Sequence, residues 1–190
     1  MRVIAGSHRG HRLSGPQGTE LRPTSDKVRE ALFSILGTQV SGGRFLDLYA
    51  GTGAVGIEAL SRGASAVTFV ESNLKAVQLL QKNLQTCQLL DRALVRVGQT
   101  ATFLDRKDWW GGPYDVLFAD PPYADLGELD ILIHAWRPGL LSKRAAVIIE
   151  QDSRTELPAS IDHAVLVRRY VYGDTALHLY DASTSVSTAS

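Results

Sequence analysis

The sequence predicts an α/β fold in which a mostly parallel sheet is covered by helices on both faces. From residue 41 onward, short apolar runs alternate with segments whose apolar residues recur at helical spacing, which is typical of strands joined by crossover helices. The first run leads into GTGAVG, which places glycines at 51, 53 and 56 in the spacing of a nucleotide-binding turn. Two apolar runs near the carboxyl terminus meet at YGDT and indicate an antiparallel pair at one side of the sheet.

The expected elements follow from the apolar spacing and from the residues that begin and end each segment. Seven runs are expected to form the strands of the main sheet: 44–50, 66–71, 93–97, 114–120, 145–151, 163–173 and 175–182. Four intervening segments are expected to be helical: 54–63, 73–90, 100–107 and 126–136. Ahead of them, short strands at 2–6 and 11–13 predict a β-hairpin, and a helix is expected over 25–36 with Gly37 as its stop.

These elements suggest three regions. Residues 1–40 would form a basic hairpin and helix packed on the main domain, residues 41–182 the main domain, and residues 183–190 a disordered polar tail. A length of 190 residues, with 44% hydrophobic and 21% charged residues, fits a soluble protein with one sizeable core.

Composition also limits the compartment and the cofactors. No apolar run approaches the length of a membrane span, and the first residues lack the apolar segment of a signal peptide. The single Cys87 cannot form an intramolecular disulfide and lies in an apolar helical pattern, so we expect a buried thiol and a cytoplasmic location. The five histidines are scattered without the short spacings of a zinc site, so no metal is expected.

Formal net charge is zero, but the charges are unevenly distributed. Residues 1–29 carry six Lys and Arg against two acidic residues, which leaves a local excess of four positive charges. A basic segment on a neutral domain is the pattern expected where one side of a protein meets phosphate, although a solvated basic surface would have the same composition. Arg9, His11, Arg12 and Arg22 are the candidate phosphate-contacting residues of this segment, and they become the RNA-binding candidates if the partner is RNA.

The glycine turn alone does not distinguish two cofactor classes. Glu71 follows Gly51 by twenty residues, where a dinucleotide-binding fold holds a ribose hydroxyl, and S-adenosylmethionine presents the same ribose. Asp47 lies four residues before the first glycine. A carboxylate there is poorly placed beside the pyrophosphate of NAD, but it suits the ammonium and sulfonium groups of S-adenosylmethionine.

The stretch DVLFADPPYADL distinguishes the two cofactor classes, NAD and S-adenosylmethionine. Asp120, Pro121, Pro122 and Tyr123 follow the fourth predicted strand, at the same sheet edge as the glycine turn. Two prolines remove two backbone donors, so the loop offers acceptors, the Asp120 carboxylate and the Pro121 carbonyl, beside an aromatic ring. The exocyclic amine of a nucleobase matches this arrangement, and this favours a methyltransferase that acts on an amine.

Taken together, RVIAGSHRGHRL, RPTSDKVREALFSIL, DLYAGTGAVGIEALSRGA and ADPPY resemble the RsmD family over roughly residues 2–181. The resemblance implies a class I S-adenosylmethionine-dependent methyltransferase that modifies N2 of a guanine in 16S ribosomal RNA. It also implies a Rossmann-like, seven-stranded sheet of order 3-2-1-4-5-7-6, and 16S RNA or the assembled small ribosomal subunit as partner of a monomeric enzyme.

The resemblance also implies a set of site residues. Gln99 stands where such enzymes often carry an aspartate that accepts a hydrogen bond from the adenine amine, and Arg22, Thr24 and Arg29 are expected over the cofactor or the target strand. The expected cofactor-binding residues are Thr24, Arg29, Asp47, Ala50, Gly51, Thr52, Gly53, Glu71, Ser72, Gln99, Thr100 and Asp120.

In the expected mechanism, Asp120 and the Pro121 carbonyl accept the two amine hydrogens, and the nitrogen attacks the methyl group directly. Tyr123 stacks on the base, which is worth about 1–3 kcal/mol for such contacts. Methylation of adenine N6 or cytosine N4, in DNA or RNA, uses the same two hydrogens and stays open as an alternative. An NAD-dependent oxidoreductase and a noncatalytic RNA-binding module are more remote alternatives, because neither has a use for the Asp-Pro-Pro-Tyr loop.

Overall fold

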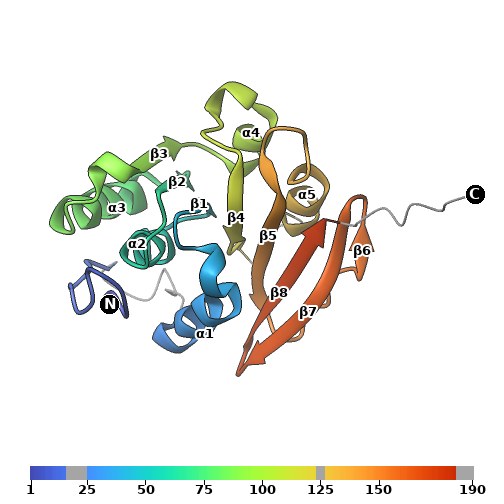
Figure 1. Cartoon of the computed structure of the whole chain (residues 1–190), viewed down its shortest axis with the longest axis horizontal. Coiled ribbons are helices and arrows are strands. Elements are labelled where there is room, and N and C mark those ends of the chain that lie inside the picture. The colour runs from blue at the N-terminus through green and yellow to red at the C-terminus, as the bar shows by residue number, and fades with distance from the viewer. Residues whose placement is uncertain (16–24, 123–126, 183–190) are drawn as a thin grey trace, which may run out of the picture.

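The computed structural model of this chain describes residues 1–15, 25–122 and 127–182, arranged as one mixed sheet between layers of helices (Figure 1). The strands are β1 (Arg44–Leu48), β2 (Ala66–Glu71), β3 (Ala93–Val97), β4 (Tyr114–Ala119), β5 (Leu141–Asp152), β6 (Ser160–Ile161), β7 (Ala164–Tyr172) and β8 (Thr175–Ala182). The α-helices are α1 (Asp26–Leu36), α2 (Ala54–Ser61), α3 (Leu74–Thr86), α4 (Thr100–Asp105) and α5 (Gly127–His134), with 3-10 turns at Gly37–Gln39, Leu90–Arg92 and Lys107–Trp109. Within these residues, no helix has the length and apolar character needed to cross a membrane.

The sheet confirms the predicted class I methyltransferase fold and corrects the strand count. Its order is β3-β2-β1-β4-β5-β8-β7-β6, with parallel pairing through β5 and antiparallel pairing from β8 onward. The seven predicted strands lie in the predicted order. The eighth, β6, is a two-residue strand that pairs Ile161 with Ala164 across a tight turn. Two residues are too few to show strand periodicity, so the pattern could not predict it.

Helices cover both faces of the sheet because successive residues of each strand point to opposite sides. One apolar core joins the sheet to α1, α2 and α3, and it includes Leu32, Phe45, Ile57, Phe69 and Leu80. The second core joins the opposite face to α4 and α5, and it includes Leu48, Phe103, Leu117, Ile131 and Ile149. Cys87 is buried in the first core, as expected for an inert thiol.

The N-terminal residues form a short hairpin with less strand structure than the predicted runs 2–6 and 11–13. One antiparallel bridge joins Arg2 and Arg12, and backbone hydrogen bonds link Val3 to His11 and Leu13 to Met1. The backbone N–H groups of Ile4 and Ala5 donate instead to the carboxylate of Glu58 on α2, at 2.7 and 2.9 Å. These two donors therefore do not extend the ladder, which explains why the hairpin stays short. We call residues 1–15 the arm.

Helix α1 begins and ends where the sequence predicts. The hydroxyl of Ser25 accepts a hydrogen bond from the backbone N–H of Val28 at 3.2 Å, which caps the first turn. Gly37 ends the helix with φ at 53°. The expected tail at 183–190 lies outside the described residues.

Candidate active site

The second and third glycines of the turn are required by packing. A Cβ on Gly53 would lie 2.1 Å from Cδ1 of Leu80, and the φ angle of Gly53 is 80°. A Cβ on Gly56 would lie 2.2 Å from the ring of Phe69 on β2. Both glycines therefore allow α2 to begin directly against the sheet and against α3.

The first glycine is required by backbone conformation and leaves space in front of the turn. Gly51 has φ at 55°, and among the described residues the atom nearest to an added Cβ would be the Tyr49 carbonyl oxygen, at 4.0 Å. Ala50 is tied to β2 by its N–H, which donates to the Val70 carbonyl at 3.0 Å. Thr52 is buried, and its carbonyl accepts a hydrogen bond from Asn83 on α3 at 2.9 Å. The turn is thus a fixed piece of backbone with an open side at Gly51.

Glu71 is held in one orientation by this turn. Its Oε2 accepts a hydrogen bond from the Gly51 N–H, and its Oε1 accepts one from the Asn73 N–H, both at 2.7 Å. Each carboxylate oxygen keeps a second lone pair, so Glu71 can still accept hydrogen bonds from a pair of hydroxyl groups. The side chain is partly exposed at the end of β2.

Asp47 is a buried carboxylate directed toward the start of α2. Only 1% of its surface is exposed, and its Oδ2 accepts a hydrogen bond from the Gly56 N–H at 2.9 Å. Burial raises the pKa of Asp47 to about 8, the Gly56 hydrogen bond opposes this shift, and the charges of Asp120 and Glu71 add to it. Three carboxyl groups therefore share one edge of the sheet, where a cationic ligand would favour the ionised form of Asp47.

The Asp-Pro-Pro loop begins at this same edge. Ala119, the last residue of β4, pairs with Leu48 of β1 on one side and with Ile149 of β5 on the other. Asp120 follows directly and is partly exposed. Pro121 is buried and Pro122 is exposed, while Tyr123 lies outside the described residues.

The polar residues expected near the adenosine follow the two outer strands. Ser72 follows β2 and is exposed; Gln99 precedes α4 and is also exposed. The Gln99 side chain does not cap that helix, and Thr100 is buried in its first turn. Gly98, just before them, donates its N–H to the Glu71 carbonyl at 3.0 Å, which holds the ends of β2 and β3 together.

Arg29, expected over the cofactor or the target strand, is a fully buried residue in this structure. Its side chain is completely buried between α1, α2 and the arm, where it donates to the Arg2 carbonyl at 2.6 Å and to Asp26 at 2.9 Å. Its Nε lies 3.9 Å from the buried carboxylate of Glu58. Its contacts are thus structural, joining the arm to α1. Arg22 and Thr24, expected beside it, lie outside the described residues.

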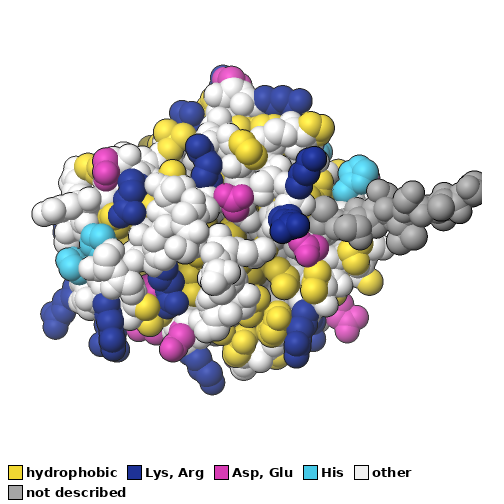
Figure 2. Space-filling view, viewed as in Figure 1, with side chains coloured by type: hydrophobic (Ala, Val, Ile, Leu, Met, Phe, Trp, Pro, Cys, Tyr) yellow, Lys and Arg dark blue, Asp and Glu magenta, His cyan; other side chains and the backbone are white. Residues whose placement is uncertain are grey.

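The expected RNA-binding residues of the arm are on the surface. Arg9, His11 and Arg12 are all exposed. Figure 2 shows Lys and Arg side chains at the lower left of this face, over the region of the arm and α1, with histidines beside them. The arrangement keeps these side chains accessible to a large partner.

Three polar side chains that the sequence analysis missed fix the arm to the helices. Glu58 accepts two arm N–H groups, and the Ser61 hydroxyl donates to the Ala5 carbonyl at 2.6 Å. The amide of Asn83 accepts from the Ser14 N–H at 2.7 Å and donates to the Ser14 and Thr52 carbonyls at 3.0 and 2.9 Å. Asn83 therefore connects the end of the arm directly to the glycine turn.

One of these residues had a signal in the sequence. Glu58 is the one acidic residue in the apolar helix segment AVGIEALS, all of which is buried. A charged residue on such a helix needs a buried partner, and this pattern predicts a polar contact from another segment. Nothing in the sequence identifies that segment as the arm, 53 to 54 positions away.

Comparison with known proteins assigns the chain to a family. The family model described as conserved hypothetical protein 95 matches residues 1–181. Ribosomal RNA small subunit methyltransferase D of Escherichia coli strain K12 is 36% identical over 181 residues, which cover 95% of this chain and 89% of that protein. The chain belongs to the RsmD family. The Bacillus subtilis protein YlbH is also similar, at 38% identity over 95% of this chain and 98% of that protein.

Two solved structures are similar to this chain over nearly its whole length. The Escherichia coli protein yhhF superposes with a TM-score of 0.83 at 36% identity, over 96% of this chain and 97% of that chain. A hypothetical protein of Thermus thermophilus superposes with a TM-score of 0.80 at 32% identity, over 96% of this chain and 99% of that chain. Because each superposition covers 96% of this chain, the similarity extends beyond the sheet to most of the molecule.

Proposed function

We propose that this RsmD-family protein transfers a methyl group from S-adenosylmethionine to the exocyclic N2 of a guanine in 16S ribosomal RNA, within the small ribosomal subunit. The observation that carries the proposal is the geometry of the acidic edge of the sheet, where buried Asp47, Glu71 bonded to the glycine turn, and Asp120 at the Asp-Pro-Pro loop meet at the ends of neighbouring strands. The Escherichia coli relative, named Ribosomal RNA small subunit methyltransferase D, supports the choice of RNA.

The acidic edge fits S-adenosylmethionine better than NAD. S-adenosylmethionine supplies an electrophilic methyl group on a sulfonium and also carries an ammonium group. Asp47 would face these positive charges, and Glu71 would accept hydrogen bonds from the ribose hydroxyls with the lone pairs that Gly51 and Asn73 leave free. A pyrophosphate at the same turn would meet three carboxyl groups. Backbone at Gly51 would approach the ligand closely, and Ser72, Gln99 and Thr100 would surround the adenine.

The Asp-Pro-Pro loop would prepare the amine of the target base. Asp120 and the Pro121 carbonyl would accept its two hydrogens, which draws the nitrogen toward a tetrahedral geometry and directs its lone pair at the methyl group. Pro122 would keep the loop rigid, and Tyr123 would stack on the base. The amine then loses one proton to Asp120 or to water. Positioning and electrostatic stabilisation of the developing ammonium would account for most of the rate.

The N-terminal region and the main domain have separate roles in this proposal. Residues 1–40 would bind RNA through Arg9, His11, Arg12 and Arg22, while residues 41–182 would hold the cofactor and carry out the reaction. We propose a cytoplasmic monomer that needs no metal. The Asn83 contacts with Ser14 and Thr52 support packing of the arm on the main domain, because they link the arm to the glycine turn.

The direct test is the transfer of tritiated methyl groups to unmodified small ribosomal subunits, with free 16S RNA and duplex DNA assayed in parallel. The expected result is label on a guanine of the subunit RNA, with labelling lost for Asp120→Ala. Label on adenine or cytosine would support the alternative amine methyltransferases instead. The absence of transfer to any of these substrates, despite tight S-adenosylmethionine binding, would contradict the proposed substrate.

A further inference from the structure

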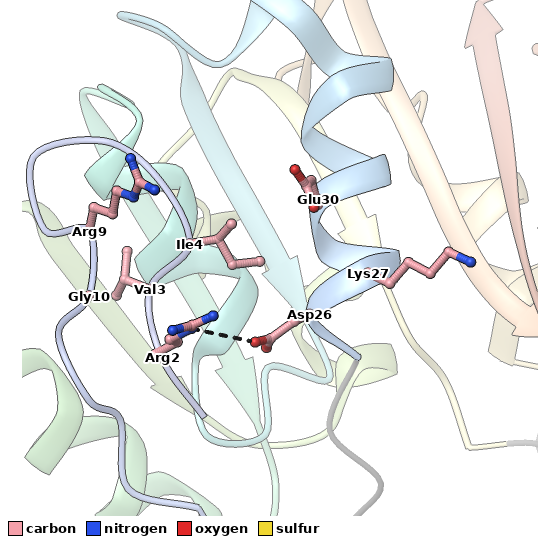
Figure 3. A pocket seen from close by; sticks show the side chains of 8 residues that line it. All are labelled: Arg2, Val3, Ile4, Arg9, Gly10, Asp26, Lys27 and Glu30. Carbon is pink, nitrogen blue, oxygen red and sulfur yellow. Dashed lines mark ion pairs between the residues drawn. The ribbon is translucent and has the colours of Figure 1, made fainter.

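The arm and α1 enclose a pocket of about 320 Å³ that is separate from the glycine turn (Figure 3). This volume is near the lower end for small-molecule sites, so the pocket suits one small group. Arg2 and Arg9 line it from the arm, and Asp26 and Glu30 line it from the first two turns of α1. Ile4 lies between them and provides an apolar surface.

The charges in this pocket are divided between its two sides. Figure 3 shows Arg9 on the arm and Glu30 on the helix; Lys27 also lines the pocket, but its side chain extends away from the arm. Within the described part of the chain, no hydrogen bond or ion pair engages the Arg9 guanidinium or the Glu30 carboxylate. Arg2 and Asp26 approach only to 3.9 Å, with side chains 70% and 51% exposed. Such an exposed pair is worth about 0–1 kcal/mol, so a ligand can replace it at little cost.

The two sides of the pocket are held at a fixed separation. Buried Arg29 donates to the Arg2 carbonyl on the arm and to the Asp26 carboxylate on the helix. Glu58 binds the N–H groups of Ile4 and Ala5, so the apolar surface is fixed as well. The pocket is therefore preformed, and a ligand would not need to order it.

We propose that this pocket binds a single unpaired nucleotide of the RNA substrate, one whose base carries an exocyclic amine. Arg9 and Arg2 bind its phosphate, Glu30 and Asp26 accept hydrogen bonds from the amine, and the base lies against Ile4. A phosphate alone satisfies only the arginines and meets two carboxylates opposite. Carboxylates accept from cytosine N4 in other nucleic-acid complexes, and RNA bases are read most readily where they are unpaired. This inference rests on the proposed function, since it assumes an RNA substrate.

The first test uses small probes and requires no ribosomal substrate. Nitrogen-15-labelled protein, saturated with S-adenosylmethionine, is titrated with cytidine monophosphate, uridine monophosphate and inorganic phosphate. We expect the amide signals of Ile4 and Gly10 to shift, with cytidine monophosphate binding about threefold to tenfold more tightly than the other two, as one net hydrogen bond allows. Equal binding of all three probes, or shifts confined to Gly51 and Gly53, would overturn the proposal.

Matched variants separate the two sides of the pocket. Glu30→Ala should remove the preference for cytidine over uridine, while Arg9→Ala should weaken both nucleotides alike. Lys143→Ala, at an exposed position of β5, should leave all three affinities unchanged. A preference that survives Glu30→Ala would show that the carboxylate does not read the base and would refute the assignment.

A second test identifies the partner in the assembled subunit. Glu30→Cys can be labelled selectively with a photoreactive maleimide, because Cys87 is buried. Crosslinking to 16S RNA is the expected result, and crosslinking only to a ribosomal protein would overturn the proposal. Methyl transfer by the wild-type protein tests the proposed function separately, so failure of the pocket and failure of the function can be distinguished.

Discussion

The sheet edge and the N-terminal arm both carry residues marked by the sequence, but they are positioned by different kinds of contact. At the sheet edge, Asp47, Glu71 and Asp120 lie at or just beyond the ends of neighbouring strands, and the pairing of β1 with β2 and β4 sets their spacing. The arm has a single backbone bridge and depends on side chains of α2 and α3. Substitutions at the sheet edge should therefore change cofactor binding and the reaction rate, whereas substitutions in the arm and its contacts should change stability and RNA binding.

The largest effect on stability is expected where the arm meets the helices. Glu58→Ala removes the acceptor of two arm N–H groups and leaves buried Arg29 with Asp26, whose side chain is 51% exposed, as its remaining charged partner. Loss of one partner from such a buried group costs about 3–5 kcal/mol. Urea denaturation should show this loss, and trypsin should cleave faster after Arg9. Glu58→Gln removes the charge but keeps an acceptor, so it should lose less. Equal losses for both variants would assign the whole effect to the charge and would contradict a contribution from the hydrogen bonds to the arm.

The next effect concerns Asp47, whose raised pKa couples cofactor binding to pH. A cationic ligand binds the ionised carboxylate best, so S-adenosylmethionine affinity should rise with pH up to about 8 and then level off. The slope should approach about tenfold per pH unit where binding releases a full proton. Calorimetry at several pH values measures this dependence of S-adenosylmethionine affinity on pH. Asp47→Asn should bind more weakly and without this slope, whereas an unchanged slope would assign the proton to another group.

The same residue makes an opposite prediction for stability without ligand. A carboxyl group whose folded pKa is raised to about 8 destabilises the fold progressively as pH rises from the unfolded value of 3.8 toward 8. Asp47→Asn should therefore raise the free energy of unfolding, by on the order of 1–3 kcal/mol near neutral pH. The gain over wild type should grow between pH 5 and 8; a constant gain would indicate that packing is responsible.

A smaller contrast should appear between two glycines of the turn. Gly53→Ala forces a Cβ against Leu80 and should cost about 1–3 kcal/mol of stability. Gly51→Ala meets open space, so its cost should be limited to the strain of a positive φ, about 1 kcal/mol. Gly51→Ala should nevertheless weaken S-adenosylmethionine binding, because its Cβ enters the space in front of the turn. Thermal unfolding measures the stability cost of each variant, and calorimetry measures S-adenosylmethionine binding. Equal stability losses with equal binding would contradict separate roles for Gly53 in packing and Gly51 in ligand binding.

The smallest effects are expected on the arm surface. Arg9→Glu combined with Arg12→Glu should weaken binding to small ribosomal subunits and reduce the salt dependence of that affinity, since each lost phosphate contact removes about one counterion from the slope. Stability should change by less than about 0.5 kcal/mol, because both side chains are exposed. Filter binding at several salt concentrations provides the measurement. An unchanged affinity and slope would remove the arm from RNA recognition.

The sequence predicted what depends on short spacing. Strand order and the sharing of one edge by Asp47, Glu71 and Asp120 follow from alternation and from the rule that parallel strands end at the same edge. Prediction from the sequence failed where segments far apart in the chain come into contact. The buried position of Arg29 depends on the arm folding back over α1, and a basic side chain near a motif looks the same in sequence whether it binds a ligand or the protein itself. The two-residue β6 was too short to leave a pattern.

The measurement that tests the account most directly is single-turnover methyl transfer to small ribosomal subunits, recorded over a range of subunit concentrations. Asp120→Ala should lower the rate at saturation by at least about 100-fold with little change in the half-saturating concentration. The Arg9→Glu, Arg12→Glu double variant should raise the half-saturating concentration and leave the saturated rate near that of wild type. A saturated rate that falls as much for the arm variant as for Asp120→Ala would contradict the separation of chemistry at the sheet edge from substrate binding on the arm.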